Sequence, residues 1–79
     1  MARKVYVAVT ALFKTDGTIL PISIEWEDGR HYEIDKIIEV RQAASLKVGG
    51  QGTRYLCRIQ GRESNLFLEG TRWFVEGKE

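Results

Sequence analysis

The sequence of 79 residues has few of the residues on which the chemistry of small proteins usually depends. Its single cysteine, Cys57, excludes an intramolecular disulfide of the kind that staples small secreted domains. Its single histidine, His31, stands beside a predicted turn, whereas a catalytic base needs a partner and a pocket. No apolar run approaches the roughly 18 residues that a membrane helix requires. These absences predict a cytoplasmic domain that is not an enzyme and that has no metal and no cofactor.

The charge of the protein is nearly balanced. A net charge of +1 is too small to indicate a nucleic-acid partner by itself. The distribution is uneven, because residues 41–62 contain no acid. The cations in this stretch are Arg41, Lys47, Arg54, Arg58 and Arg62.

The first hairpin is predicted from alternation and a turn signal. Residues 5–13 are β-branched and apolar with a period of two, which is typical of a strand. A two-residue loop at Asp16-Gly17 pairs Val9 with Ile24 and matches the apolar sets of both strands. Pro21 lies near the start of the second strand, where its missing N–H must face an edge or a bulge.

The second hairpin turns at Asp28-Gly29. A two-residue loop there would place apolar residues on the same face as polar ones, which side-chain parity forbids. A three-residue loop, with the glycine in the left-handed conformation, pairs Ile24 with Tyr32 and Ile22 with Ile34. This register places the apolar side chains inside and His31 outside.

The next segment has two interpretations. A strand that passes a bulge near Asp35-Lys36 and reaches about Arg41 is favoured by its β-branched residues. A helix near 35–44 is the alternative, with Asp35 as N-cap. Residues 43–52 are rich in glycine and small side chains, which is typical of a connection.

Three short strands are predicted after this connection, at residues 53–60, 65–69 and 71–77. A four-residue turn pairs Ile59 with Leu66, and a two-residue turn at Glu69-Gly70 pairs Leu66 with Trp73. The whole protein, residues 1–79, is therefore one all-β domain: a small antiparallel barrel or roll of five to six strands. An SH3-like barrel is favoured over an OB-like barrel, and an α+β fold is the third alternative.

A longer pattern supports the barrel. The spacing Trp26-x-x-Gly29-Arg30-x-Tyr32-x-Ile34, followed by Arg58, Gly61-Arg62, Leu66 and Trp73-Phe74-Val75, resembles a family of short uncharacterised bacterial proteins of similar length. The resemblance implies a small SH3-like β-barrel. That family has no assigned activity, so the resemblance implies no functional residues.

The predicted registers place Phe67 between Arg58 and Arg72 on the outer face of the last three strands, flanked by Leu56 and Phe74. The candidate binding surface is Arg54, Leu56, Arg58, Phe67, Arg72 and Phe74, with Arg41, Lys47 and Arg62 as secondary basic residues. Aromatic residues and arginine are enriched at protein interfaces, which favours an interaction module that forms a homodimer or binds a protein partner. The alternative is single-stranded DNA or RNA, stacked on the two phenylalanines. A third interpretation is that arginine stems cover the two rings and nothing binds.

Overall fold

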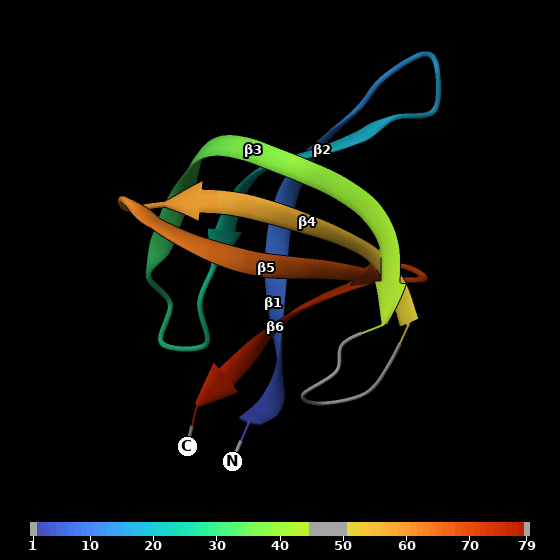
Figure 1. Cartoon of the computed structure of the whole chain (residues 1–79). Helices are drawn as coiled ribbons and strands as arrows, with labels where there is room; N and C mark the ends of the chain where they lie inside the picture. Colours follow the sequence, from blue (N-terminus) through green and yellow to red (C-terminus); the bar gives the residue numbers. More distant parts are fainter. Residues whose placement is uncertain (1, 45–50, 79) are drawn as a thin grey trace.

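The computed structural model describes residues 2–44 and 51–78, with side chains described over 3–42 and 52–76. The strands are β1 (Ala2–Phe13), β2 (Ile19–Glu25), β3 (His31–Ala44), β4 (Gln51–Ile59), β5 (Arg62–Glu69) and β6 (Arg72–Lys78). Each strand pairs with the next in antiparallel fashion, and β6 returns to β1 (Figure 1). This closed antiparallel barrel confirms the predicted fold class. Its order contains no Greek-key crossover, so the OB-like alternative is wrong.

The described residues contain no helix, and 35–44 lie within a strand, so the α+β alternative is also wrong. No helix in the described ranges is long and apolar enough to cross a membrane. β3 passes a bulge at Asp35, as predicted, and continues beyond Arg41 to Ala44. A second bulge at Ile38 was not predicted.

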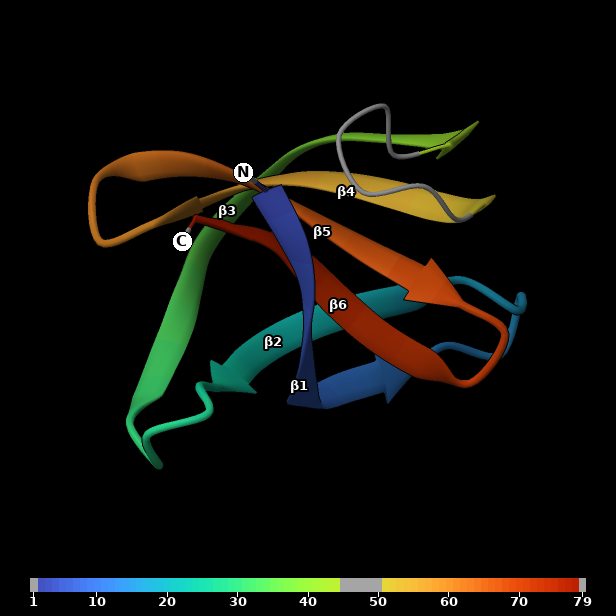
Figure 2. The ribbon, with the colours of Figure 1, turned by 90° about the horizontal axis from the view of Figure 1, so that it is seen from below.

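Two bent strands join the sheets of the barrel. β1 pairs with β6 from Ala2 to Val7 and then with β2 from Ala8 onward (Figure 2). β3 pairs with β2 only through residues 31–33, and from Ile34 it pairs with β4. The barrel is therefore two small sheets that share β1 and β3.

The second hairpin has the predicted loop. The Trp26 N–H donates to the Arg30 carbonyl at 2.8 Å, and Gly29 has a φ of 88°. Ile24 lies opposite Tyr32, which confirms the predicted pair. The pair Ile22–Ile34 is wrong, because Ile34 lies opposite Ile59 on β4.

The first hairpin reaches the predicted register by a different route. The Lys14 N–H donates to the Thr18 carbonyl at 2.8 Å, so the loop has three residues instead of two. The partner sequence then skips Ile22, which forms a bulge beside Pro21. The bulge compensates for the extra loop residue, and Val9 lies opposite Ile24 as predicted.

The last two hairpins differ from the predicted registers. Leu66 lies opposite Tyr55 instead of Ile59, and Trp73 lies opposite Leu68 instead of Leu66. Both differences are an even number of residues, so each side chain keeps its predicted face. The core accordingly contains the predicted apolar residues: Val5, Val7, Ile24, Tyr55, Cys57, Leu66, Trp73 and Val75.

Gly52 corrects the prediction that residues 43–52 form only a connection. It lies in β4, opposite Ala43. A Cβ at this position would overlap the carbonyl oxygen of Leu68 on β5. Glycine therefore permits a close approach of β4 and β5.

Candidate interaction surfaces

The aromatic residues of the predicted surface lie in a row across the outer face of the sheet. Phe67 has Arg54 as its neighbour on β4 and Phe74 as its neighbour on β6. Phe74 in turn has Tyr6 as its neighbour on β1. The predicted neighbours of Phe67, Arg58 and Arg72, are therefore wrong. We call Tyr6, Phe67 and Phe74 the outer aromatic row.

The two phenylalanines of the row are not accessible. Phe74 is 0% and Phe67 2% exposed, although neither belongs to the inner core cluster. Their rings are stacked at 4.9 Å between centroids with an interplanar angle of 7°, and Tyr6 meets Phe74 edge-on at 5.9 Å. Neither ring is therefore exposed as the predicted stacking platform or contact residue, because both are almost completely buried within the protein.

Charged groups close the β1 end of the row. The Lys4 ammonium lies 5.0 Å from the Phe74 centroid and forms an ion pair with Glu69 at 3.4 Å. The Tyr6 hydroxyl donates to the other Glu69 oxygen at 3.3 Å. The Arg72 guanidinium lies over the Tyr6 ring, 3.6 Å from its centroid. Cationic side chains therefore lie on this aromatic surface, but the cation over Phe74 is Lys4, and the arginine of the described contacts, Arg72, lies over Tyr6 and not over a phenylalanine.

Glu39 neutralises two cations of the acid-free segment. Arg54 Nη2 donates to Glu39 Oε1 at 2.8 Å, and Arg41 Nη2 donates to Glu39 Oε2 at 3.0 Å. The Arg54 Nε is buried and has no hydrogen-bond partner among the described residues. Both guanidinium groups are paired with the same carboxylate, although the Arg41 side chain also remains exposed to solvent, so the segment is less basic than its composition suggests.

The remaining predicted residues do not complete a common surface. Arg58 and Arg62 are exposed, and Arg58 lies opposite Glu63 on β5. Leu56 is half-buried, opposite Asn65. Lys47 lies outside the described residues. Of the predicted residues, the structure therefore brings Arg41, Arg54, Phe67 and Phe74 into one direct row across β3, β4, β5 and β6.

The candidate reactive residues are placed as predicted. Cys57 is buried, and burial raises the pKa of its thiol to about 11, so it is not a thiolate at neutral pH. Burial also raises the pKa of Tyr55, whose hydroxyl donates to the Ile19 carbonyl at 2.7 Å. His31 is exposed, 3.6 Å from Glu25. Within the described ranges, no group of three or more His, Cys, Asp or Glu residues is placed to bind a metal ion.

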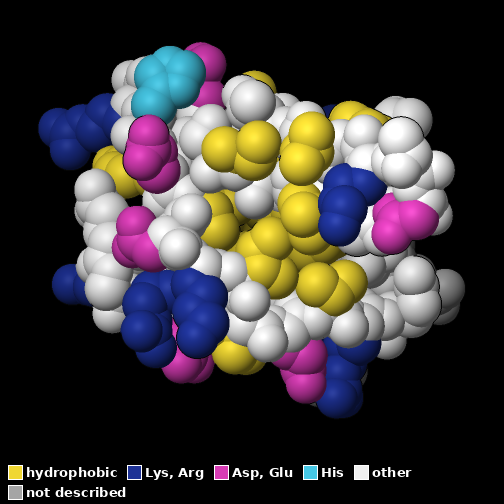
Figure 3. Space-filling view, turned by 90° about the horizontal axis from the view of Figure 1, so that it is seen from above, with side chains coloured by type: hydrophobic (Ala, Val, Ile, Leu, Met, Phe, Trp, Pro, Cys, Tyr) yellow, Lys and Arg dark blue, Asp and Glu magenta, His cyan; other side chains and the backbone are white. Residues whose placement is uncertain are grey.

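Sequence reasoning missed an apolar surface on β2 and β3. Ile22, Ile38 and Val40 are 48%, 39% and 49% exposed. Figure 3 shows apolar side chains gathered on the face seen from above, where β2 and β3 lie. We call Ile22, Ile38 and Val40 the β2–β3 face. The Ile37-Ile38 pair, which breaks the period of two, is the signal in the sequence that indicates such a bulge.

Comparison with known proteins adds no family to this description. Searches with protein-family models, against curated proteins and against solved structures found no match. The resemblance to short bacterial proteins therefore stays a prediction.

Proposed function

We propose that the protein is a small interaction module that self-associates through the β2–β3 face. The observation that carries this proposal is the exposure of Ile22, Ile38 and Val40 on two adjacent strands of a small barrel. Apolar surface in water is unfavourable by about 25 cal/mol per Å², so clustered aliphatic side chains gain free energy when a partner covers them.

The geometry of the two strands explains why this surface is open. Only Ser23–Glu25 of β2 pairs with β3, so the first half of β2 and the second half of β3 share no ladder. Both Ile22 and Ile38 are bulge residues, and bulges interrupt the regular strand edge. Association through side chains is therefore favoured over pairing of strand edges.

A second copy is a suitable partner on electrostatic grounds. The protein has a net charge of +1, so two copies repel each other only weakly. Charges of both signs stand beside the apolar residues of β3, at Lys36, Glu39 and Arg41. A two-fold arrangement buries the same patch on both copies.

Light scattering over a range of protein concentrations tests this proposal. We expect a mass that rises toward that of a dimer in the wild type and stays that of a monomer in Ile38→Glu. Gln60→Glu, in the exposed β4–β5 turn, adds the same charge and should associate like the wild type. A monomeric wild type at high micromolar concentration, or an associating Ile38→Glu variant, contradicts the proposal.

Binding of single-stranded nucleic acid is not advanced as a second function. It required Phe67 and Phe74 as stacking platforms, and both are buried. No other observation on the described residues favours it.

A further inference from the structure

A cleft opens where β1 leaves β6. The last pair between the two strands is Val7 with Trp73, and from Ala8 onward β1 pairs with β2. The cleft beyond this point has a volume of about 480 Å³ and lies between residues 6–9 and 71–73. Its size is within the range of ligand pockets, about 300–1,000 Å³.

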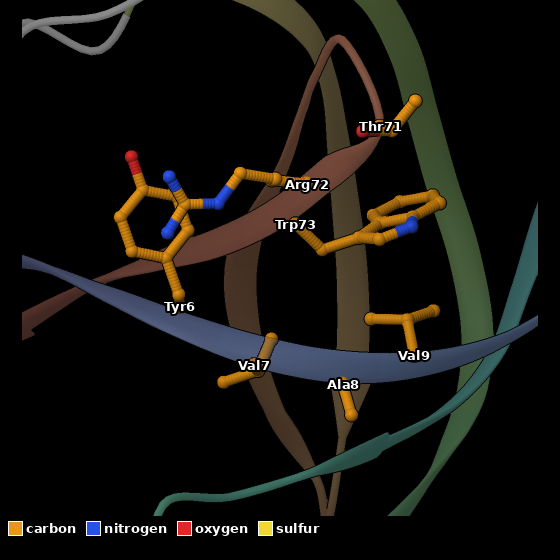
Figure 4. Close-up of a pocket in the computed structure, with 7 residues that line it drawn as sticks. All are labelled: Tyr6, Val7, Ala8, Val9, Thr71, Arg72 and Trp73. Atoms are coloured by element: carbon orange, nitrogen blue, oxygen red, sulfur yellow. The ribbon is translucent and has the colours of Figure 1, made fainter.

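The cleft is lined by apolar and aromatic side chains together with Thr71 and the charged Arg72, and its exposed walls are at least as polar as they are apolar. Figure 4 shows the Arg72 guanidinium lying over the Tyr6 ring, and Trp73 and Val9 facing each other farther along the cleft. Thr71 contributes a hydroxyl beside them. This arrangement fits a ligand with both polar and apolar groups that carries an anionic group.

Arg72 is positioned to bind a carboxylate. None of the described carboxylates forms an ion pair with it. The nearest candidate, its cross-strand neighbour Glu69, is bound by Lys4 and Tyr6. Stacking on Tyr6 at 3.6 Å orients the planar guanidinium, whose N–H groups suit a bidentate carboxylate.

The backbone of β1 offers a second set of contacts. From Ala8 to Phe13, β2 occupies one edge of β1, and no strand in the described part of the protein pairs with the other edge. Alternate N–H and C=O groups on that edge can pair with an extended peptide, as in recognition by strand addition. The cleft therefore combines a strand edge, a floor that includes Val9 and Trp73, and an oriented cation.

We propose that this cleft binds an extended peptide segment, which pairs with the β1 edge and places a carboxylate on Arg72. The carboxylate is either an Asp or Glu side chain or the C-terminus of the peptide, because both present the same group to the guanidinium. This site is separate from the β2–β3 face, and the proposal does not depend on self-association.

The test is a titration of the ¹⁵N-labelled Ile38→Glu variant, in which self-association does not interfere. Three acetylated pentapeptide pools are used: a central Glu with a C-terminal amide, a central Gln with a C-terminal amide, and acid-free residues with a free C-terminus. We expect the Glu pool, the free C-terminus pool or both to shift the amides of Ala8 and Thr10 and the Nε–H of Arg72. Binding of the Gln pool should be at least about tenfold weaker, a difference of about 1.4 kcal/mol.

Substitutions at Arg72 test whether this residue is responsible for the preference for carboxylate peptides. Arg72→Gln should abolish the preference for the carboxylate pools, and Arg72→Lys should retain part of it, because lysine keeps the charge without the planar donors. Arg62→Gln, which removes another exposed arginine, should bind like its parent. Equal binding of all three pools, or no binding of any pool, overturns the proposal. Shifts confined to Arg72 that sodium acetate reproduces also overturn it, because they indicate a small-anion site only.

Discussion

The outer aromatic row and the β2–β3 face are both apolar surfaces outside the inner core, yet the two phenylalanines of the row are closed to solvent and the aliphatic side chains of the face are open to it. Phe67 and Phe74 are almost completely buried, whereas Ile38 and Val40 are about as exposed as ordinary surface residues. The sequence suggests the reverse, because its alternation predicts phenylalanines beside arginines on the outer face of the last three strands. Apolar content alone therefore does not identify an accessible surface.

The difference follows from strand pairing. The row crosses strands that are paired in an unbroken ladder, so Phe67 and Phe74 each have neighbours on both sides, and Lys4 lies over Phe74. The β2–β3 face lies where pairing stops after three residues and where bulges at Ile22 and Ile38 interrupt the strands. Neighbours that would cover the side chains are missing from this part of the described structure.

The largest loss of stability is expected from a substitution in the outer aromatic row. Phe74→Ala should lower the free energy of unfolding by about 3–5 kcal/mol, because it removes a fully buried ring and its stacked partner contact. Urea denaturation followed by tryptophan fluorescence measures this change. A loss below about 1 kcal/mol would show that the row is not part of the packed structure.

Cys57, in the inner core, should make the stability of the protein depend on pH. Its thiol ionises near pH 9 when unfolded and near pH 11 when folded, so the unfolded state loses its proton first as the pH rises. Stability from this group is complete below pH 9 and should fall by up to about 3 kcal/mol toward pH 11, at about 1.4 kcal/mol per pH unit. The difference between wild type and Cys57→Ala, from urea denaturation at several pH values, isolates this contribution. A constant difference across the window contradicts it.

The ion pairs of Glu39 with Arg41 and Arg54, at the β4 end of the row, should contribute less to the free energy of unfolding. Glu39→Gln removes the carboxylate that accepts from Arg41 and Arg54. We expect a loss of about 1 kcal/mol at low salt that shrinks as salt is added, because both partners remain partly exposed. Glu63→Gln, an exposed acid elsewhere on the sheet, is the matched control and should change stability by less. A salt-independent loss would show that packing and not charge is responsible.

The smallest effect on stability is expected in the β2–β3 face. Ile38→Ala should cost less than about 1 kcal/mol in the monomer, because the side chain is already exposed to solvent. Urea denaturation at a concentration below self-association measures it. A loss comparable to that of Phe74→Ala would contradict the contrast between the two surfaces.

Much of the fold could be predicted from the sequence, because side-chain parity constrains strands strongly. The Ile24–Tyr32 and Val9–Ile24 pairs were predicted correctly. The β4–β5 turn, which has two residues instead of four, and the β5–β6 turn, which is shifted by one residue, changed the partners of Leu66 but not its face. Turn lengths depend on local hydrogen bonds that several sequences satisfy equally well.

The surfaces were less predictable, for a different physical reason. Parity tells which face a residue occupies, but the cover on Phe74 comes from Lys4 and Tyr6, far away in the sequence. The ion pair of Arg54 with Glu39 also joins distant positions. The exposure of Ile22 depends on a bulge that compensates for the length of a turn. Each of these features depends on the curvature of the assembled sheet.

Association through the β2–β3 face, and not through the outer aromatic row, is the central expectation for this protein. Dilution of ¹⁵N-labelled wild-type protein from high to low concentration, followed by amide shifts, tests it directly. We predict concentration-dependent shifts at residues 19–22 and 34–40 and constant shifts at Phe67 and Phe74. Shifts centred on Phe67 and Phe74, or no concentration dependence at any residue, would contradict the account.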